Sequence, residues 1–222
     1  MKRFARFGCV SVLCALMLGA CASPGLKPEI NLDERQANLE ALTDFGFRGG
    51  LGVWTDEQSI SARIQWEQTR DRLTVGLTGP LGIGDMRLIS EGQSASLKRG
   101  DKVVSSGMSA DTVLQNGLGL AAPIPVSQLQ RWVRGLPGQA SSVKTDATGK
   151  LASLRYTDAQ GTRWQARFLK YSKVDGLELP ALITASGGPY SVRLVLKNWQ
   201  RDYNTTVEEK VPVKTRLAIP AR

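Results

Sequence analysis

The residue types that usually carry enzymatic chemistry are scarce in this sequence. Its 222 residues include no histidine and three cysteines. Without histidine the chain lacks the usual general base, the Ser-His-Asp triad and histidine metal ligands. The stretch Gly107–Asp111 approaches a Gly-x-Ser-x-Gly nucleophile elbow, but it ends in aspartate and no histidine could serve its serine. We therefore expect no catalytic residue, no metal site and no cofactor.

The one side chain expected to react is the thiol of Cys21. Three basic residues in the first six positions precede an apolar run over residues 7–18. This run is shorter than the roughly 20 residues that span a bilayer, and it suits a secretory signal. It leads into Leu-Gly-Ala-Cys at 18–21, which resembles a lipobox, where a peptidase cleaves before the cysteine and the thiol is acylated. An ordinary signal with an incidental cysteine is the alternative interpretation.

Cleavage before Cys21 would change both the charge and the cysteine content. The signal peptide, residues 1–20, takes with it three positive charges, Cys9 and Cys14, so the net charge falls from +9 to +6 and no disulfide can form. Residue 22 is alanine, whereas an aspartate there tends to retain enterobacterial lipoproteins in the inner membrane. We expect a lipid-anchored protein on the periplasmic face of the outer membrane.

The mature chain divides into a tether, one domain and an extension. Residues 21–30 contain two prolines and predict a flexible lipidated tether. Residues 31–43 predict a short amphipathic helix on which Leu32, Leu39 and Leu42 share a face. The single domain is expected over 31–199, and residues 200–222 are expected to form a C-terminal extension.

Alternating apolar residues and short turns predict an antiparallel meander. About ten strands are expected, and a sheet of that size tends to curl on itself. The expected fold is mainly β with a few helices, an unclosed antiparallel barrel. The strand segments are 45–54, 60–67, 73–78, 86–89, 94–98, 102–105, 141–145, 151–156, 162–170, 177–183 and 190–199.

Period-2 alternation places a set of large apolar side chains on the inner face of this barrel. They line either a solid core or a cavity for acyl chains. The set comprises Ile60, Ile64, Trp66, Val75, Leu77 and Leu88.

Two helices are expected in the middle of the chain, over 109–119 and 126–134. The apolar stripe across them comprises Leu114, Leu118, Leu129 and Trp132, with Gln128 and Arg131 expected on the outside. The helices either cover one open end of the barrel or form a lid over a lipid cavity.

The loop between the third and fourth strands is unusually apolar. Residues 79–84 contain three glycines and a proline, yet the only sizeable side chains are Leu81 and Ile83. These two side chains either fold back onto the core or form a finger that inserts into a membrane or meets an acyl chain.

Four segments together resemble the LolB family of outer-membrane lipoprotein receptors. They are Phe47–Trp54 with Ala62–Trp66, Thr78–Gly82, Pro123–Gly138 (PIPVSQLQRWVRGLPG) and Lys197–Trp199. The resemblance covers about residues 30–199, and its most specific part is IP…L..W..GLPG. Two departures are the chain beyond Trp199 and the glycine-rich Gly82-Ile83-Gly84.

The resemblance implies a fold, a function and partners. It implies helices over a hydrophobic cavity in an unclosed barrel, and a monomer that takes lipoproteins from the periplasmic carrier LolA and inserts them into the outer membrane. Leu81 matches the family's protruding leucine, which is needed for insertion. The implied partners are LolA, lipoprotein acyl chains and the membrane, and no nucleic acid is expected.

Two alternatives stay open from the residues alone. The barrel could belong to a structural or assembly lipoprotein that docks a protein partner without binding acyl chains. The basic charge could be an ordinary solvated surface, or it could favour approach to anionic headgroups or to an acidic carrier.

Overall fold

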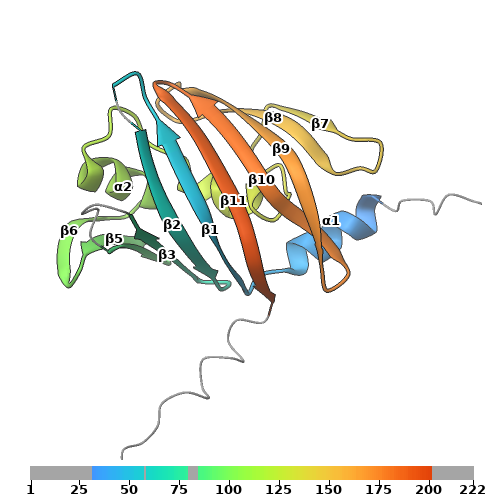
Figure 1. The fold of residues 1–222 in the computed structure, drawn as a ribbon, viewed down its shortest axis with the longest axis horizontal. Helices are drawn as coiled ribbons and strands as arrows, with labels where there is room; N and C mark the ends of the chain where they lie inside the picture. Colours follow the sequence, from blue (N-terminus) through green and yellow to red (C-terminus); the bar gives the residue numbers. More distant parts are fainter. Residues whose placement is uncertain (1–31, 58, 80–84, 202–222) are drawn as a thin grey trace, which may run out of the picture. The chain divides into compact units, whose positions relative to one another are not determined.

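The described residues form an open antiparallel sheet of eleven strands, close to the ten or so predicted, with three helices (Figure 1). The computed structural model describes residues 32–57, 59–79 and 85–201. Neighbouring strands follow the order β6-β5-β4-β3-β2-β1-β11-β10-β9-β8-β7. The edge strands β6 and β7 are not paired with each other, so the barrel is unclosed. The predicted fold class is confirmed.

Each hairpin connection contains a glycine or an aspartate that interrupts the alternation. All the strand pairs are antiparallel. Each pair consists of strands consecutive in the chain, except for β1 and β11, which are the first and last strands. The strands are β1 (Phe45–Trp54), β2 (Ser59–Gln68), β3 (Arg72–Thr78), β4 (Met86–Glu91), β5 (Ser94–Arg99), β6 (Lys102–Gly107), β7 (Ser142–Thr145), β8 (Leu151–Thr157), β9 (Arg163–Val174), β10 (Leu177–Gly187) and β11 (Tyr190–Arg201).

The last strand is longer than expected and changes face near its end. Asn198 has a left-handed backbone with φ +48°. The pairing of β1 with β11 shifts there, so that Asn198 and Trp199 together lie opposite Phe47. This bulge turns Trp199 inward, where its ring centroid lies 5.0 Å from that of Phe47. The strand then continues to Arg201, so residues 200 and 201, expected in the extension, belong to the sheet.

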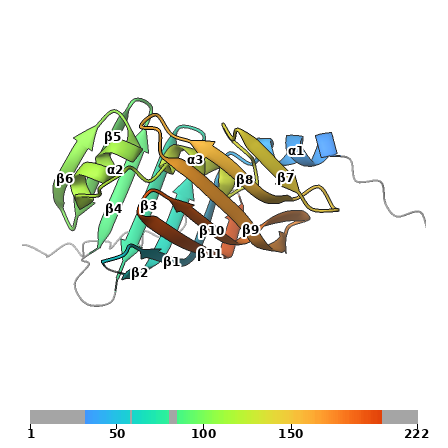
Figure 2. The same ribbon diagram turned by 90° about the horizontal axis from the view of Figure 1, so that it is seen from above.

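The three helices are α1 (Leu32–Ala41), α2 (Ala110–Leu118) and α3 (Val126–Trp132). Helix α2 packs against β4, β5, β6 and α3, and Figure 2 shows it beside β5 and β6. Gly117 permits the close approach of α2, because a Cβ there would lie 2.5 Å from Leu97 Cδ2. On α1 and just after it, Leu39 and Leu42 are buried as predicted, whereas Leu32 is exposed.

The core lies on the inner face of the sheet, beneath α2 and α3. An aromatic cluster crosses the three central strands, with Phe47 on β1 stacked against Trp66 on β2 at 5.7 Å and in contact with Trp199 on β11. The Trp66 indole N–H donates to Gln68 Oε1, which satisfies a buried donor. Aliphatic side chains predominate on the inner face over β1–β5, where it encloses a cavity, while β9 and β11 add buried Trp164, Phe168 and Tyr190.

Candidate functional site

An entirely apolar cavity lies between the inner face of the sheet and the two central helices. Each of its 17 lining residues is hydrophobic. Thirteen come from strands β1–β5, β10 and β11, and the helical side contributes Leu114, Ile124, Val126 and Leu129. The cavity volume is about 70 Å³. Walls of this composition are complementary to an apolar ligand.

The structure brings together five of the six residues that the alternation placed on this face. Ile64, Trp66, Val75, Leu77 and Leu88 all line the cavity. The exception is Ile60, which is 36% exposed and does not line it. The placement of Ile60 in the cavity was wrong, because it lies opposite Val53 near the end of the β1–β2 hairpin, where alternation continues but burial does not.

Of the four apolar residues predicted on the helices, two line the cavity and two do not. Leu114 and Leu129 line the cavity directly. Trp132 is fully buried and Leu118 packs against the core, but neither lines the cavity. The two helices therefore contribute both cavity wall and ordinary core.

Hydrogen bonds tie the two helices to each other and to the sheet. The Asp111 carboxylate on α2 accepts the backbone N–H and the hydroxyl of Ser127 on α3, both at 3.0 Å. Burial raises the pKa of Asp111 above its ordinary value, while the hydrogen bonds from Ser127 oppose that rise. The N–H of Ala122, in the connection between the helices, donates to the Tyr190 hydroxyl at 3.2 Å.

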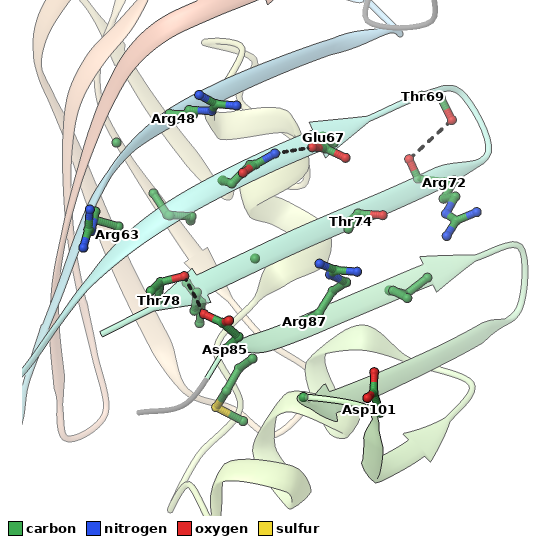
Figure 3. Close-up of a pocket in the computed structure, with 18 residues that line it drawn as sticks. Arg48, Arg63, Glu67, Thr69, Arg72, Thr74, Thr78, Asp85, Arg87 and Asp101 are labelled. Atoms are coloured by element: carbon green, nitrogen blue, oxygen red, sulfur yellow. Dashed lines mark hydrogen bonds between the residues drawn. The ribbon is translucent and has the colours of Figure 1, made fainter. Parts of the chain in front are cut away.

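The opposite face of the sheet carries a second, polar hollow. It has a volume of about 1150 Å³, and its lining comes from β1–β4 and the turn between β5 and β6. At its margin are Ile64, Leu77 and Met86, which also line the apolar cavity. Four arginines and three carboxylates line it, and Figure 3 shows Arg48, Arg63 and Arg87 there. Thr78 Oγ1 donates to Asp85 at 3.0 Å across the ends of β3 and β4. Sequence reasoning missed this hollow, because the alternation within one strand does not show which polar residues of neighbouring strands face a common depression.

Three residues with predicted roles lie outside the described residues. They are Cys21, expected to carry the acyl anchor, and Leu81 and Ile83 of the apolar loop between β3 and β4. Their roles stay predictions.

Comparison with known proteins decides the family. The profile described as "Outer membrane lipoprotein LolB" matches residues 43–199. A relative from Erwinia tasmaniensis named outer-membrane lipoprotein LolB is 29% identical over 84% of this chain and 92% of its own length. Another LolB, from Pseudomonas savastanoi pv. phaseolicola, is 33% identical over 75% of this chain and 79% of its own length. The chain belongs to the LolB family.

The fold agrees with a more distant likeness. A solved LolA superfamily protein from Nitrosomonas europaea superposes with a TM-score of 0.51, covering 75% of this chain and 93% of that one. At 10% identity this likeness concerns the fold alone. Membership in the LolB family makes the chain an outer-membrane lipoprotein of the Lol pathway. Among the described residues no helix has the length and apolarity to cross a membrane.

The segment on which the resemblance rests most specifically, within Pro123–Gly138, forms a structural clamp at the end of α3. Trp132 is fully buried, and its indole N–H donates to the Pro137 carbonyl at 3.3 Å. Gly135 and Gly138 adopt φ values of +83° and +60°, which glycine adopts without strain. The segment Gly-Leu-Pro-Gly therefore turns back over the helix that precedes it.

Gln128 lies beneath this clamp, and its predicted exposure was wrong. The side chain is buried, accepts the Gln139 N–H at 3.0 Å and donates to Gln139 Oε1 at 3.2 Å. Helical periodicity put Gln128 on the outer face of α3, but the returning segment covers that face. A glutamine can be buried there because both ends of its amide are paired.

Arg134, just after α3, is a buried charge that the sequence did not reveal. Its guanidinium donates to the carbonyls of Leu39 at 3.4 Å and Leu42 at 2.9 Å, and it lies 5.9 Å from the Phe45 ring centroid. Burial lowers its pKa. The contact joins the end of α3 to the last turn of α1 and to the segment between α1 and β1.

Proposed function

We propose that this chain receives lipoproteins from the periplasmic carrier LolA, holds their acyl chains in the apolar cavity and delivers them to the outer membrane. The observation that carries the proposal is the cavity whose 17 lining residues are all hydrophobic. Three long acyl chains resist transfer into water by roughly 30 kcal/mol or more, at about 0.8 kcal/mol per methylene. A receptor without catalytic groups can therefore work by shielding the chains until they reach the bilayer.

The cavity volume implies that loading needs a movement. At about 70 Å³, the cavity is smaller than the roughly 150 Å³ in which an apolar protein cavity holds one benzene molecule. Acyl chains therefore enter only if the walls separate. The helical wall is the part that can separate without breaking strand pairing, since only the helices contribute no rungs to the sheet. We assign α2 and α3 the role of a lid.

Transfer from the carrier tests this proposal. LolA loaded with a labelled lipoprotein is mixed with residues 22–222, which lack the proposed acylated cysteine, and the label is followed after separation. We expect transfer, because Cys21 sets location and does not shape the cavity. Failure of this folded fragment to take up cargo would overturn the proposal and would favour a lipoprotein that only docks a protein partner.

A matched pair on α2 then asks whether the cavity holds the cargo. Leu114 lines the cavity, whereas Asn116 on the same helix is exposed. Leu114→Glu should abolish transfer and Asn116→Glu should preserve it. Because a buried charge can unfold the domain, Leu129→Trp serves as a second variant that fills the cavity with an apolar group. Normal transfer by folded Leu129→Trp and Leu114→Glu proteins would contradict cavity binding.

The loop between β3 and β4 is proposed to act at delivery, through Leu81 and with Ile83 beside it. Burying one leucine in hydrocarbon contributes about 1.5–3 kcal/mol, enough to bias a loop into the bilayer surface but too little to anchor a protein. Leu81→Glu should leave the melting temperature and uptake from LolA unchanged and should block release into vesicles, whereas Leu81→Ile should behave as wild type. Loss of uptake together with a lower melting temperature would instead place Leu81 in the core.

A further inference from the structure

The outer face of the sheet carries rows of cations that the proposed receptor function does not use. Strand pairing defines the first row. Lys98 on β5 is opposite Arg87 on β4, and Arg48 on β1 is opposite Lys197 on β11. Gly76 on β3 and Gln65 on β2 connect these pairs, since Arg87 is opposite Gly76, Gly76 opposite Gln65, and Gln65 opposite Arg48. Six adjacent strands thus present four cations and no carboxylate in one row.

A second row crosses the other half of the sheet. Gly52 on β1 is opposite Arg193 on β11, and Thr184 on β10 lies between Arg193 and Arg167 on β9. The row continues through Ser153 on β8 to Lys144 on β7. It adds three cations and again no carboxylate. Both rows lie on the outer face, because neighbours of their members along the strands, such as Phe47, Val192 and Ala166, are buried on the inner face. On β7 the neighbour of Lys144, Val143, is exposed but lies opposite buried Leu154, which gives Lys144 the same orientation.

The four cations of the first row have no polar partner among the described residues. No ion pair or hydrogen bond of the described residues involves the side chain of Arg48, Arg87, Lys98 or Lys197. The carboxylates that line the same hollow are in part engaged, since Glu67 accepts a hydrogen bond from Gln65 and Asp85 accepts one from Thr78. Arg48 and Arg87 both border the hollow of about 1150 Å³ (Figure 3). The face thus has unpaired positive charge around a depression large enough for several headgroups.

We propose that this outer face docks on the anionic phospholipids of the membrane in which the protein is anchored. The charges are complementary, and each Lys or Arg near an anionic surface strengthens binding by about five-fold. With its anchor expected at Cys21, the eleven residues 21–31 can span at most about 40 Å, so the domain always lies close to the headgroups. Docking through the outer face turns the inner face, with the cavity, α2 and α3, away from the bilayer and toward arriving cargo.

Binding to vesicles tests the docking face. Residues 22–222 contain the whole compact unit of 31–222 and are mixed with vesicles of phosphatidylglycerol and phosphatidylethanolamine, or of phosphatidylcholine alone, and sedimented. We expect binding to the anionic vesicles only, weakened by salt because exposed charges are screened. Inorganic phosphate at constant ionic strength should not displace the protein. Displacement by phosphate would indicate a site for a single ion and would overturn the proposal.

A charge-matched pair of variants separates this face from net charge. Arg48→Gln with Arg87→Gln removes two cations of the first row. Arg99→Gln with Lys102→Gln removes two cations from the neighbouring β5–β6 hairpin, where Arg99 is opposite buried Met86 and so lies on the other side of the sheet. The first pair should weaken vesicle binding by about thirty-fold and the second by less than about three-fold. Equal losses, or no loss in the first pair, would overturn the proposal.

The orientation gives an independent readout. Residues 22–222 contain no cysteine, so single labels can be placed at Ser61→Cys on the outer face and Asn116→Cys on α2. On anionic vesicles, the label at 61 should become protected from a water-soluble quencher while the label at 116 stays accessible. Protection at 116 with accessibility at 61 would overturn the proposal. It would also be overturned if the wild-type protein failed to bind vesicles and used Arg48 and Arg87 to bind soluble LolA. The inference depends on residence at the membrane and not on acyl-chain binding, so normal vesicle binding without cargo transfer would refute only the receptor function.

Discussion

The Asp111 carboxylate accepts both the backbone N–H and the hydroxyl of Ser127 at 3.0 Å and so joins α2 to α3 through one half-buried acid. The hydrogen bonds and the burial of Asp111 shift its pKa in opposite directions. The hydrogen bonds favour the charged carboxylate, but burial disfavours it more, and the pKa of Asp111 is raised. The connection between α2 and α3 is therefore sensitive to pH.

The sign of this sensitivity follows from linkage. Between the unfolded pKa of aspartate and the raised folded pKa of Asp111, the native protein binds more protons than the unfolded chain, so stability falls as pH rises through this window. Asp111→Asn should remove that fall and flatten the dependence of the melting temperature on pH on the acidic side of neutrality. Thermal melts of both proteins across this range provide the measurement. An unchanged pH profile in Asp111→Asn would contradict the assignment.

The Gly-Leu-Pro-Gly clamp predicts a stability defect that depends on contact as well as on backbone angle. At Gly138, φ is +60° and an added Cβ would lie 2.5 Å from Gln128 Oε1. Gly161 has φ +83° with nothing within 4 Å. Gly161→Ala should cost about 1 kcal/mol from backbone strain alone, and Gly138→Ala should cost at least about 2 kcal/mol. Denaturant unfolding measures both losses of stability. Equal losses would mean that Gln128 moves aside from the added Cβ at residue 138 without a cost in stability.

Much of the fold could be predicted from the sequence because period-2 alternation and turn residues are local signals. They correctly indicated the antiparallel meander and placed Ile64 and Val75 facing inward. The same alternation failed at Ile60, since parity fixes the face of a side chain but not how far along the strand its neighbours cover it. The prediction that Gln128 is exposed failed because the segment after α3 returns and covers it. A local sequence pattern does not show such a return.

The bulge in β11 was also not predicted, although its signal was present. Asparagine tolerates the left-handed region better than most residues, and Asn198 stands directly before the tryptophan that it turns inward. Strict alternation would have placed Trp199 on the outer face, after inward-facing Leu194 and Leu196. The rows of cations on the outer face were not predicted for a different reason. Their members become neighbours only through the strand register, which the sequence does not show.

Substitutions at Asn198 should therefore follow backbone preference. A β-branched residue is strained at φ +48°, so Asn198→Val should destabilise the domain by about 1–2 kcal/mol and loosen the packing of Trp199 on Phe45 and Phe47. Asn198→Gly should retain the bulge and cost less. Denaturant unfolding, followed by tryptophan fluorescence, checks both variants. A valine variant as stable as wild type would show that the bulge is not required for the position of Trp199.

Two isoleucines on β2 offer a controlled test of the cavity. Ile64 is 5% exposed and lines the cavity, whereas Ile60, four residues earlier with the same parity, is 36% exposed and does not line it. Glutamate at the two positions adds the same charge to the same strand. Ile64→Glu should weaken the binding of a fluorescent fatty acid by at least tenfold, which is about 1.4 kcal/mol, while Ile60→Glu should bind as wild type.

Stability decides what kind of interior the charge has entered. In a cavity whose lid can open, the carboxylate introduced by Ile64→Glu reaches water, and the variant should stay folded with a modest loss in melting temperature. In a solid core the same carboxylate would be desolvated without a partner, which would unfold the domain. Thermal melts measured beside the fatty-acid titration distinguish the two. A large loss of stability in Ile64→Glu, with fatty-acid binding by wild type absent or unaffected by Leu129→Trp, would mean that the 17 apolar residues form a core and not a binding site.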